Sequence, residues 1–142
     1  MSIGSDRFVL FPLGEAKKRF ALCADNVVEL ARPDVLYRFP HTTPLLDGVL
    51  LRRGRVVPVL DIARVLMGGG AAKGRYYLMA TGAFGQQQWT AIPVMGECEM
   101  VTAEATPAPS TLPEYVCSLL DLEDEIVEVL DLRAISTMGA AA

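Results

Sequence analysis

The feature of this sequence that most restricts its fold is an internal repeat at a constant offset of 70 positions. No gap is needed to align the two copies. The longest matched stretch pairs residues 56–62 (VVPVLDI) with residues 126–132 (IVEVLDL). Other matched pairs are Ala21 with Ala91, Leu22 with Ile92, Glu29 with Glu99, Leu30 with Met100 and Leu50 with Leu120. A constant offset over so many apolar and acidic positions predicts two structurally similar halves.

The boundary between the halves is predicted in residues 68–74 (GGGAAKG), whose composition is that of a flexible linker. The halves then span residues 7–67 and 75–136. Each half consists of short apolar runs separated by glycine, proline and acidic turn residues. The predicted strands are residues 7–13, 19–24, 48–53, 55–60, 75–81, 87–94, 97–101, 115–120 and 126–130, with a proline-rich loop at 106–113.

These strands form predicted hairpins, of which one turns at Gly54 and another across residues 123–125. Many short strands with such turns predict a mainly β fold, and we expect each half to close into a small barrel that hides its strand edges. Short helices are predicted at residues 62–67 and 131–137. Asp61 and Asp131 precede them at equivalent places, where an aspartate accepts backbone N–H groups as an N-cap.

Composition and charge exclude several classes of partner. The net charge is −4 and the pI is near 5.0, whereas nucleic-acid binding and anionic membrane surfaces both call for a basic face. Residues 1–7 lack the apolar core of a signal peptide, and no run approaches about 18 apolar residues, so we expect no direct membrane insertion. Cys23, Cys98 and Cys117 form no CxxC pair, which favours three buried thiols in a reducing cytoplasm.

No constellation for catalysis or metal binding is visible. His41 is the only histidine and lies in a predicted loop, residues 38–44. A zinc site needs three or four ordered ligands, and a nucleophile needs an adjacent base. No phosphate-binding glycine motif occurs, and the acidic run 121–125 is typical of a solvated turn. We therefore expect no cofactor, no metal and no enzymatic activity.

Residues 48–62 (GVLLRRGRVVPVLDI) resemble the central segment of CheW-like domains, in which a Gly-x-Ile-Asn-Leu-Arg-Gly run precedes Val-Val-Pro-Val-x-Asp-Leu. Residues 8–14, 20–22 and 27–30 are similar to the first strands of that family, and residues 115–132 to its last hairpin. The resemblance implies one CheW-like domain over residues 7–136. Its fold is mainly β: two small five-stranded SH3-like β-barrel subdomains around a shared hydrophobic core, with short helices.

The same resemblance implies a function. Members of this family are non-enzymatic chemotaxis adaptors that couple chemoreceptors, the methyl-accepting proteins, to a CheA-type histidine kinase. The implied partners are the regulatory domain of the kinase and the cytoplasmic tip of the receptors. The implied location is cytoplasmic, in receptor arrays at the inner membrane.

Site residues follow from position in the family pattern. Val27, Glu29 and Leu30 correspond to receptor-binding positions, and Arg53 with Gly54 to a kinase- or receptor-binding position. Val27 and Leu30 are three residues apart, so one helical turn could place them together. The alternative is that Val27 and Leu30 are simply buried, with Glu29 solvated.

The pattern departs from the family at Leu51, Arg52 and Ser118, where the family has Asn, Leu and Gly. A spacer or competitor that binds only one partner in a non-standard signalling system is therefore an alternative function. A small β-barrel enzyme or ligand-binding protein is an alternative from another class.

Arg52 poses a local problem, because strand alternation places it on the same face as apolar Leu50. An unpaired guanidinium is too costly to bury. Either a one-residue bulge before Gly54 turns Leu51 inward, which we favour, or Arg52 escapes at an exposed strand end. The first of these hypotheses predicts that Leu51→Asp destabilises the fold. The turns at residues 52–55 and 122–125 are equivalent in the repeat and opposite in charge.

Overall fold

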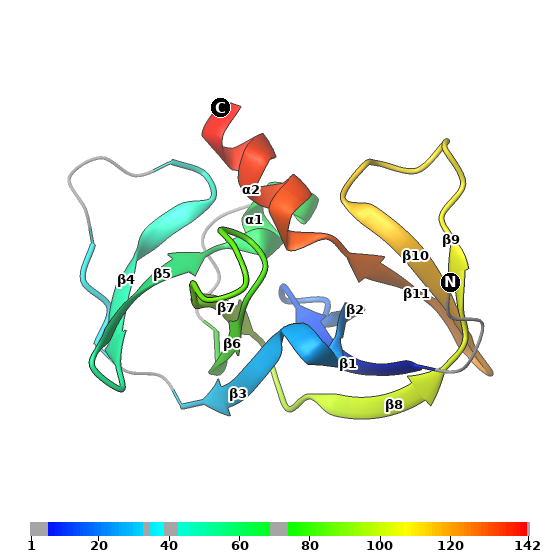
Figure 1. Cartoon of the computed structure of the whole chain (residues 1–142), viewed down its shortest axis with the longest axis horizontal. Helices are drawn as coiled ribbons and strands as arrows, with labels where there is room; N and C mark the ends of the chain where they lie inside the picture. Colours follow the sequence, from blue (N-terminus) through cyan, green and yellow to red (C-terminus); the bar gives the residue numbers. More distant parts are fainter. Residues whose placement is uncertain (1–5, 33–34, 39–42, 69–73, 142) are drawn as a thin grey trace.

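The computed structural model describes residues 6–32, 35–38, 43–68 and 74–141 (Figure 1). His41 and most of the predicted linker lie outside the described residues. The fold is mainly β, as predicted, with two sheets and two short α-helices in the part of the chain described. None of the helices in these ranges has the length and hydropathy required to cross a membrane.

One sheet has six strands in the order β8-β1-β2-β11-β10-β9 and lies on the right in Figure 1. Its neighbours are antiparallel except for the parallel pair β2 and β11. Its strands are β1 (Asp6–Leu13), β2 (Lys18–Cys23), β8 (Glu99–Ala103), β9 (Ala105–Pro107), β10 (Val116–Leu122) and β11 (Glu125–Leu130).

The other sheet has five strands in the order β3-β6-β7-β5-β4, with one parallel pair, β5 and β7. Its strands are β3 (Val27–Ala31), β4 (Leu46–Arg52), β5 (Arg55–Leu60), β6 (Tyr76–Ala80) and β7 (Thr90–Val94). A single 3-10 turn, η1 (Ala24–Asn26), leads from β2 into β3, and α1 (Ile62–Met67) and α2 (Leu132–Ala141) follow β5 and β11.

The repeat is present in the structure as a repeat of elements. The bounds of β10 and β11 equal those of β4 and β5 plus 70, and α1 and α2 begin at residues 62 and 132. The strand order β3-β6-β7-β5-β4 also matches β8-β1-β2-β11-β10 strand for strand. The sixth strand, β9, has no counterpart in this match and lies partly within the predicted proline-rich loop.

The prediction that each half closes its own barrel is wrong. The six-stranded sheet takes β1 and β2 from the first half and its other strands from the second, while the five-stranded sheet takes β6 and β7 from the second half. Each sheet therefore depends on both halves. Strands from different halves meet at the parallel pairs β2–β11 and β5–β7 and at the antiparallel pairs β1–β8 and β3–β6.

A shared core joins the two sheets, as the family resemblance implied. Its buried side chains come from β1 and β2 of one sheet, from β6 and β7 of the other, and from both helices; they include Phe11, Leu13, Phe20, Leu22, Leu78, Ile92, Val94, Ile62 and Ile135. Each sheet also encloses a smaller cluster of its own, around Leu50, Val57, Val59 and Met79 in one and around Phe8, Leu10, Leu120 and Val127 in the other.

The predicted helix caps are confirmed. The Asp61 carboxylate accepts the backbone N–H of Arg64 at 3.1 Å, and the Asp131 carboxylate accepts those of Arg133 and Ala134 at 3.0 and 3.3 Å. Asp61 is almost fully buried, and Arg64 also pairs with it at 3.3 Å. The contacts with Arg64 offset only part of the cost of burying the carboxylate, since burial still raises the pKa of Asp61.

Candidate functional site

The β4–β5 hairpin ends in a two-residue turn, Arg53-Gly54, with both residues in the left-handed backbone region (φ 52° and 73°). Positive φ at both central positions is the geometry of a type I′ turn, which matches the twist of the flanking strands. A Cβ atom on Gly54 would meet nothing within 4 Å. Glycine at position 54 is therefore favoured by the backbone conformation of the turn, and not by close packing against other residues of this chain.

We expect Gly54→Ala to lower the free energy of unfolding by about 1 kcal/mol, because a Cβ is disfavoured at positive φ. The matched control is Asp124→Ala at the equivalent position of the β10–β11 turn, where φ is not positive. Its effect should stay within about 0.5 kcal/mol. Urea denaturation of both variants gives the comparison. Equal losses would show that the turn conformation does not set the requirement for glycine.

The favoured bulge before Gly54 is absent, and its consequence for Leu51 is wrong. Residues 49–52 pair in regular register with residues 55–58, and the only shift in this hairpin lies between Leu46 and Gly48. Leu51 is 55% exposed, so Leu51→Asp is not expected to destabilise the fold. The Arg52 side chain points inward and is partly buried near the end of β4, where it pairs with a carboxylate.

That carboxylate is Glu29 on β3. The Arg52 Nε donates to Glu29 Oε2 at 2.9 Å, while Arg53 donates from Nε to Oε2 at 3.2 Å and from Nη2 to Oε1 at 3.0 Å. The exposed fractions of the side chains are 19% for Glu29, 33% for Arg52 and 63% for Arg53. We call these three residues the Glu29 clasp.

The clasp connects the two edges of the five-stranded sheet. β3 and β4 are its terminal strands. The outer edge of β4, which does not pair with β5, also forms a backbone bridge between Val49 and Tyr37. The sequence pattern assigned Glu29 and Arg53 to separate contacts, whereas the structure brings them together. The structure also gives Arg52 a role that the sequence pattern did not predict, because Arg52 donates to the same Glu29 carboxylate.

Both arginines favour the ionised form of Glu29. Hydrogen bonds from Arg53 and then Arg52 lower the pKa of Glu29 from 4.5 to about 2, against a smaller opposing effect of burial. The hydrogen bond to Glu29 likewise raises the pKa of Arg53. A carboxyl group whose pKa is lower in the folded state stabilises the fold above its unfolded pKa, and this contribution disappears as the pH falls through the folded pKa.

The window for this effect runs from about pH 4.5 down to about pH 2. Across this pH window, we expect Glu29→Gln to lose less stability than the unaltered chain as the pH falls. The difference should be no more than about 1 kcal/mol, because solvent screens a partly exposed ion pair. Glu123→Gln, which changes a turn carboxylate outside the clasp, is the control. Chemical denaturation at several pH values measures the difference, and parallel pH profiles for the Glu29 variant and the unaltered chain would contradict it.

The helical turn expected to join Val27 and Leu30 is absent, because both residues lie on strand β3. Val27 and Glu29 share one face, and Val27 is half-buried against the shared core. Val28 and Leu30 point the other way and are 40% and 37% exposed. The expectation that Glu29 is simply exposed is also wrong.

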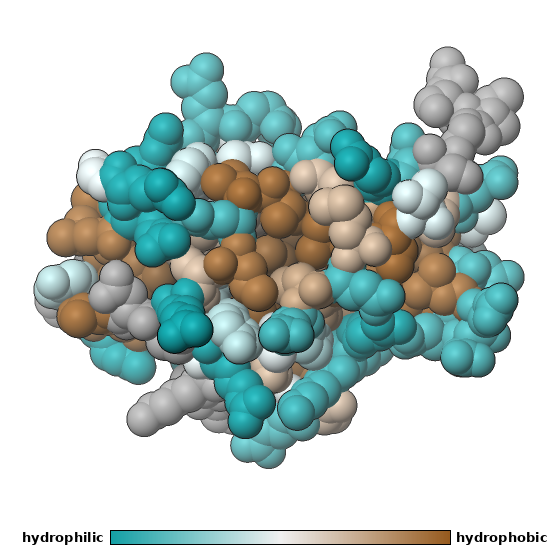
Figure 2. All heavy atoms as spheres, turned by 90° about the horizontal axis from the view of Figure 1, so that it is seen from below, coloured by the Kyte–Doolittle hydropathy of each residue, from teal (hydrophilic) through white to brown (hydrophobic). Residues whose placement is uncertain are grey.

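The strands β3 and β8 together present an apolar face. Figure 2 views the molecule from the side of these strands and shows apolar atoms gathered across the middle of that face. The exposed apolar side chains of the two strands are Val28, Leu30 and Met100, and the last two are equivalent in the repeat. This surface adjoins the clasp through β3.

The equivalent end of the six-stranded sheet carries a second ionic cluster that the sequence pattern did not reveal. Arg19 donates to Glu125 Oε1 from Nε at 2.8 Å and also from Nη2, and to Glu99 from Nη1 at 2.9 Å. At the other end, the guanidinium of Arg55 stacks on Trp89 at 4.5 Å. Positions 19 and 89, and 55 and 125, are related by the offset of 70, so the two contacts occupy equivalent places in the repeat.

The described residues offer little for redox or metal chemistry. No group of three or more potential ligands comes together among them. The prediction of three buried thiols is wrong, because Cys23 and Cys98 are only partly buried and Cys117 is exposed. Partial burial still raises the pKa of the Cys98 thiol to about 11 and is the main reason that the pKa of Cys117 is raised. A thiol with a raised pKa is a poor nucleophile at neutral pH. Arg53, the β3 surface and the two charged hairpins are thus the features suited to binding a macromolecule.

Comparison with known proteins gives a consistent result. Residues 7–83 match the family model described as "CheW-like domain". Protein FrzA of Myxococcus xanthus is 35% identical over 80 residues, which are 54% of this chain and 49% of FrzA. The match therefore spans about half the length of that relative. The scaffolding protein TtCheW from Thermoanaerobacter tengcongensis has a similar structure, with a TM-score of 0.75 and 18% identity over 90% of this chain and 85% of TtCheW.

Proposed function

Because this chain belongs to the CheW-like domain family, we propose that it is a non-enzymatic adaptor that couples chemoreceptors to a CheA-type histidine kinase. The single observation that carries the proposal is the family match over residues 7–83, which contains the whole Glu29 clasp and its hairpin. The similarity in fold to a protein described as a scaffold supports it. We further propose that residues 7–136 act as one unit, located in the cytoplasm at receptor arrays.

Arg53 is the clasp residue best positioned to contact a partner protein. Its Nε and one Nη2 hydrogen are engaged by Glu29, which fixes the guanidinium while the side chain remains 63% exposed. A guanidinium has five N–H donors, so several remain free of the Glu29 carboxylate. A side chain that is already fixed loses little conformational freedom when a partner binds. We propose that Arg53 contacts the regulatory domain of the kinase or the receptor, with Gly54 holding the turn.

The receptor surface is proposed on the outer face of β3. Leu30, which is 37% exposed, is suited to direct contact with a receptor helix, whereas half-buried Val27 supports the strand from inside. Glu29 sets the position of Arg53 and closes the sheet. Apolar side chains at the centre of an interface with charged groups at its rim are the usual arrangement of protein–protein contacts.

A spacer or competitor that binds only one partner is the second candidate. The observation that favours it is the occupancy of Glu29: both of its oxygens accept hydrogen bonds from Arg52 and Arg53, so little acceptor capacity is left for a receptor. Arg52 stands where the family has an apolar residue, and it is the reason for this extra hydrogen bond.

The two candidates are separated by measuring binding to each partner in turn. Purified chain is titrated by calorimetry with the regulatory domain of a CheA-type kinase and with the cytoplasmic tip of a chemoreceptor, both from the source organism. The adaptor role predicts binding to both, and the spacer role predicts binding to only one. Absence of binding to either partner would contradict both candidates.

A further inference from the structure

The two halves have the same local structure where each hairpin leads into its helix. Asp47 in β4 and Cys117 in β10 are related by the offset of 70, and each is the extra residue at a register shift in its hairpin. Asp61 and Asp131, which are also related by this offset, accept the backbone N–H of the third residue after them at 3.1 and 3.3 Å. The side chains around the two helix caps can therefore be compared position by position.

In the first half, the guanidinium of Arg64 lies between the bulged residue and the cap. Its Nη2 is 3.3 Å from Asp61 Oδ2 and 3.8 Å from Asp47 Oδ1. Both carboxylate side chains are largely buried, and most of the Arg64 side chain is covered as well. One long cationic side chain thus pairs with both carboxylates at this place in the fold.

In the second half, a hollow of about 400 Å³ adjoins the equivalent cap. The counterpart of Arg64 is Ala134, and the counterpart of Asp47 is Cys117, so the second half lacks the guanidinium and one of its carboxylates. Asp131 and Cys117, which correspond to the two partners of Arg64, both line the hollow. The hollow therefore lies where the first half holds its arginine.

The other walls of the hollow come from elements that are distant in sequence. Cys23 is the last residue of β2, Asn26 lies in η1, and Gly82 and Gly85 belong to the loop between β6 and β7. That loop lies beside the start of α2 (Figure 1), where Ser136 Oγ donates to one of its carbonyl groups at 3.1 Å. Both halves of the sequence contribute walls, so the hollow forms only in the complete fold.

The polar groups of the hollow suit a cation better than an anion. Asp131 Oδ1 already accepts the N–H groups of Arg133 and Ala134, so these amides at the start of α2 are not available to an anion. Asp131 Oδ2 has no hydrogen-bond partner among the residues that the structure describes. The side-chain amide of Asn26 adds a neutral acceptor. A guanidinium group has five N–H donors in a plane, and this geometry matches that of a carboxylate.

We propose that this hollow binds the guanidinium group of a ligand, in the place that Arg64 occupies in the first half. The ligand class is an arginine side chain presented by another protein, or a small free compound with the same group. A group of so few atoms binds weakly by itself, so millimolar affinity is expected. The site includes no residue of the Glu29 clasp or of the outer face of β3, and the proposal does not depend on the adaptor role.

Arg133 is the one basic residue on the walls of the hollow, and its charge opposes the binding of a second cation. Its side chain is exposed and can turn toward solvent when a ligand enters. Arg133→Gln should therefore strengthen the binding of a guanidinium compound.

The test is an amide NMR titration of the full-length chain with Nα-acetyl-arginine methylamide. The control is the citrulline analogue, which has nearly the same shape but no charge. We expect saturable shifts at Cys117 and at residues 82–86 and 131–134 with the arginine compound, and none with the citrulline compound. Equal shifts with both compounds, or arginine-dependent shifts confined to the acidic turn at residues 121–125, overturn the proposal.

Two variants remove the site in different ways. Ala134→Arg supplies the guanidinium from the chain itself, whereas Asp131→Asn removes the charge and keeps a side chain that caps helices. Each should weaken binding by more than about tenfold, the usual effect of losing a charged hydrogen bond. Thr137→Arg is the control, because it adds the same charge about one turn further along α2 and should change binding by less than about twofold. Undiminished binding by Ala134→Arg overturns the proposal.

The reverse exchange tests the equivalence of the two halves. Arg64→Ala opens the corresponding space in the first half and leaves buried Asp61 without its cation, so this variant should unfold at a lower temperature. The arginine compound should raise that temperature more than it does for the unaltered chain, and failure to do so contradicts the equivalence. Thermal unfolding also establishes which variants are folded. If Arg64→Ala is not folded, the variants at positions 131 and 134 carry the test.

The same titration separates the two sources of the guanidinium group. Agmatine represents a small free compound, and the tripeptide Gly-Arg-Gly represents the side chain of a partner protein. Tighter binding of the tripeptide assigns the site to a partner protein, and tighter binding of agmatine assigns it to a free compound. Binding of neither at tens of millimolar overturns the proposal.

Discussion

Residues 1–68 and residues 74–142, produced as separate fragments, are each expected to remain unfolded. The first fragment lacks β6 and β7, two of the three inner strands of the five-stranded sheet, and the second lacks β1 and β2 of the six-stranded sheet. The missing strands carry buried Leu78, Met79 and Ile92 in one case and Phe11 and Leu22 in the other.

The size of this effect follows from the apolar burial that is lost. Each large buried side chain contributes about 2 kcal/mol, so the loss of two inner strands costs about 10 kcal/mol or more, which is comparable with the whole stability of about 5–15 kcal/mol that a domain of this kind has. Circular dichroism and amide NMR spectra of each fragment measure the outcome. An equimolar mixture of the fragments is the control and should recover dispersed signals. A cooperative unfolding transition in either fragment alone would show that its half folds independently.

Charge reversal in the Glu29 clasp is expected to separate partner binding from folding. Arg53→Glu removes an exposed guanidinium but leaves the Arg52–Glu29 pair, so the free energy of unfolding should change little. Binding to the kinase or receptor partner should fall more than about tenfold, because a repelling charge then stands at the proposed contact.

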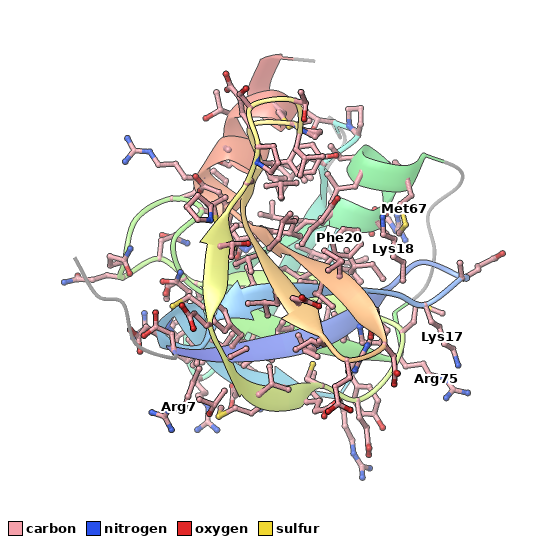
Figure 3. The ribbon with its side chains drawn as sticks, turned by 90° about the vertical axis from the view of Figure 1, so that its right-hand side faces the viewer. Arg7, Lys17, Lys18, Phe20, Met67 and Arg75 are labelled. Carbon is pink, nitrogen blue, oxygen red and sulfur yellow. The ribbon has the colours of Figure 1, made fainter. Side chains whose placement is uncertain are left out.

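Glu29→Lys should behave differently. It places a third cation beside Arg52 and Arg53 in a partly buried position and leaves both without their carboxylate. We expect a loss of about 2 kcal/mol, between the values for exposed and buried pairs, together with loss of binding. Arg7→Glu, which changes an exposed residue of β1 (Figure 3), is the control and should change neither property. Normal binding by Arg53→Glu would remove Arg53 from the proposed contact.

The sequence pattern predicted most elements because their signals are local. The sequence located β4, β5, β10, β11 and α1 within about two residues, and the start of α2 but not its end, since apolar alternation and turn residues are properties of neighbouring positions. The pattern could not predict that the halves exchange strands. The parallel pairs β5–β7 and β2–β11 join residues far apart in sequence, and no local signal identifies which strand lies beside which.

The same limit explains the outcome at the candidate site. Positional resemblance identified Glu29 and Arg53, but their ion pair depends on the edges of the five-stranded sheet meeting, which is a tertiary property. The favoured bulge near Leu51 was wrong because the cost of burying Arg52 was considered without its partner. Because Glu29 accepts a hydrogen bond from the Arg52 guanidinium, the β4–β5 hairpin can keep its regular register and Leu51 can stay exposed.

The adaptor role is tested most directly by co-retention of kinase and receptor through this chain. A receptor tip is immobilised, the regulatory domain of the CheA-type kinase is passed over it, and the amount retained is measured with and without the chain at about 150 mM salt, near physiological ionic strength. The adaptor role predicts that the kinase domain is retained in proportion to the chain added, and that Arg53→Glu reduces this retention. If the chain binds the receptor tip yet retains no additional kinase domain, or displaces it, then it does not couple the two proteins.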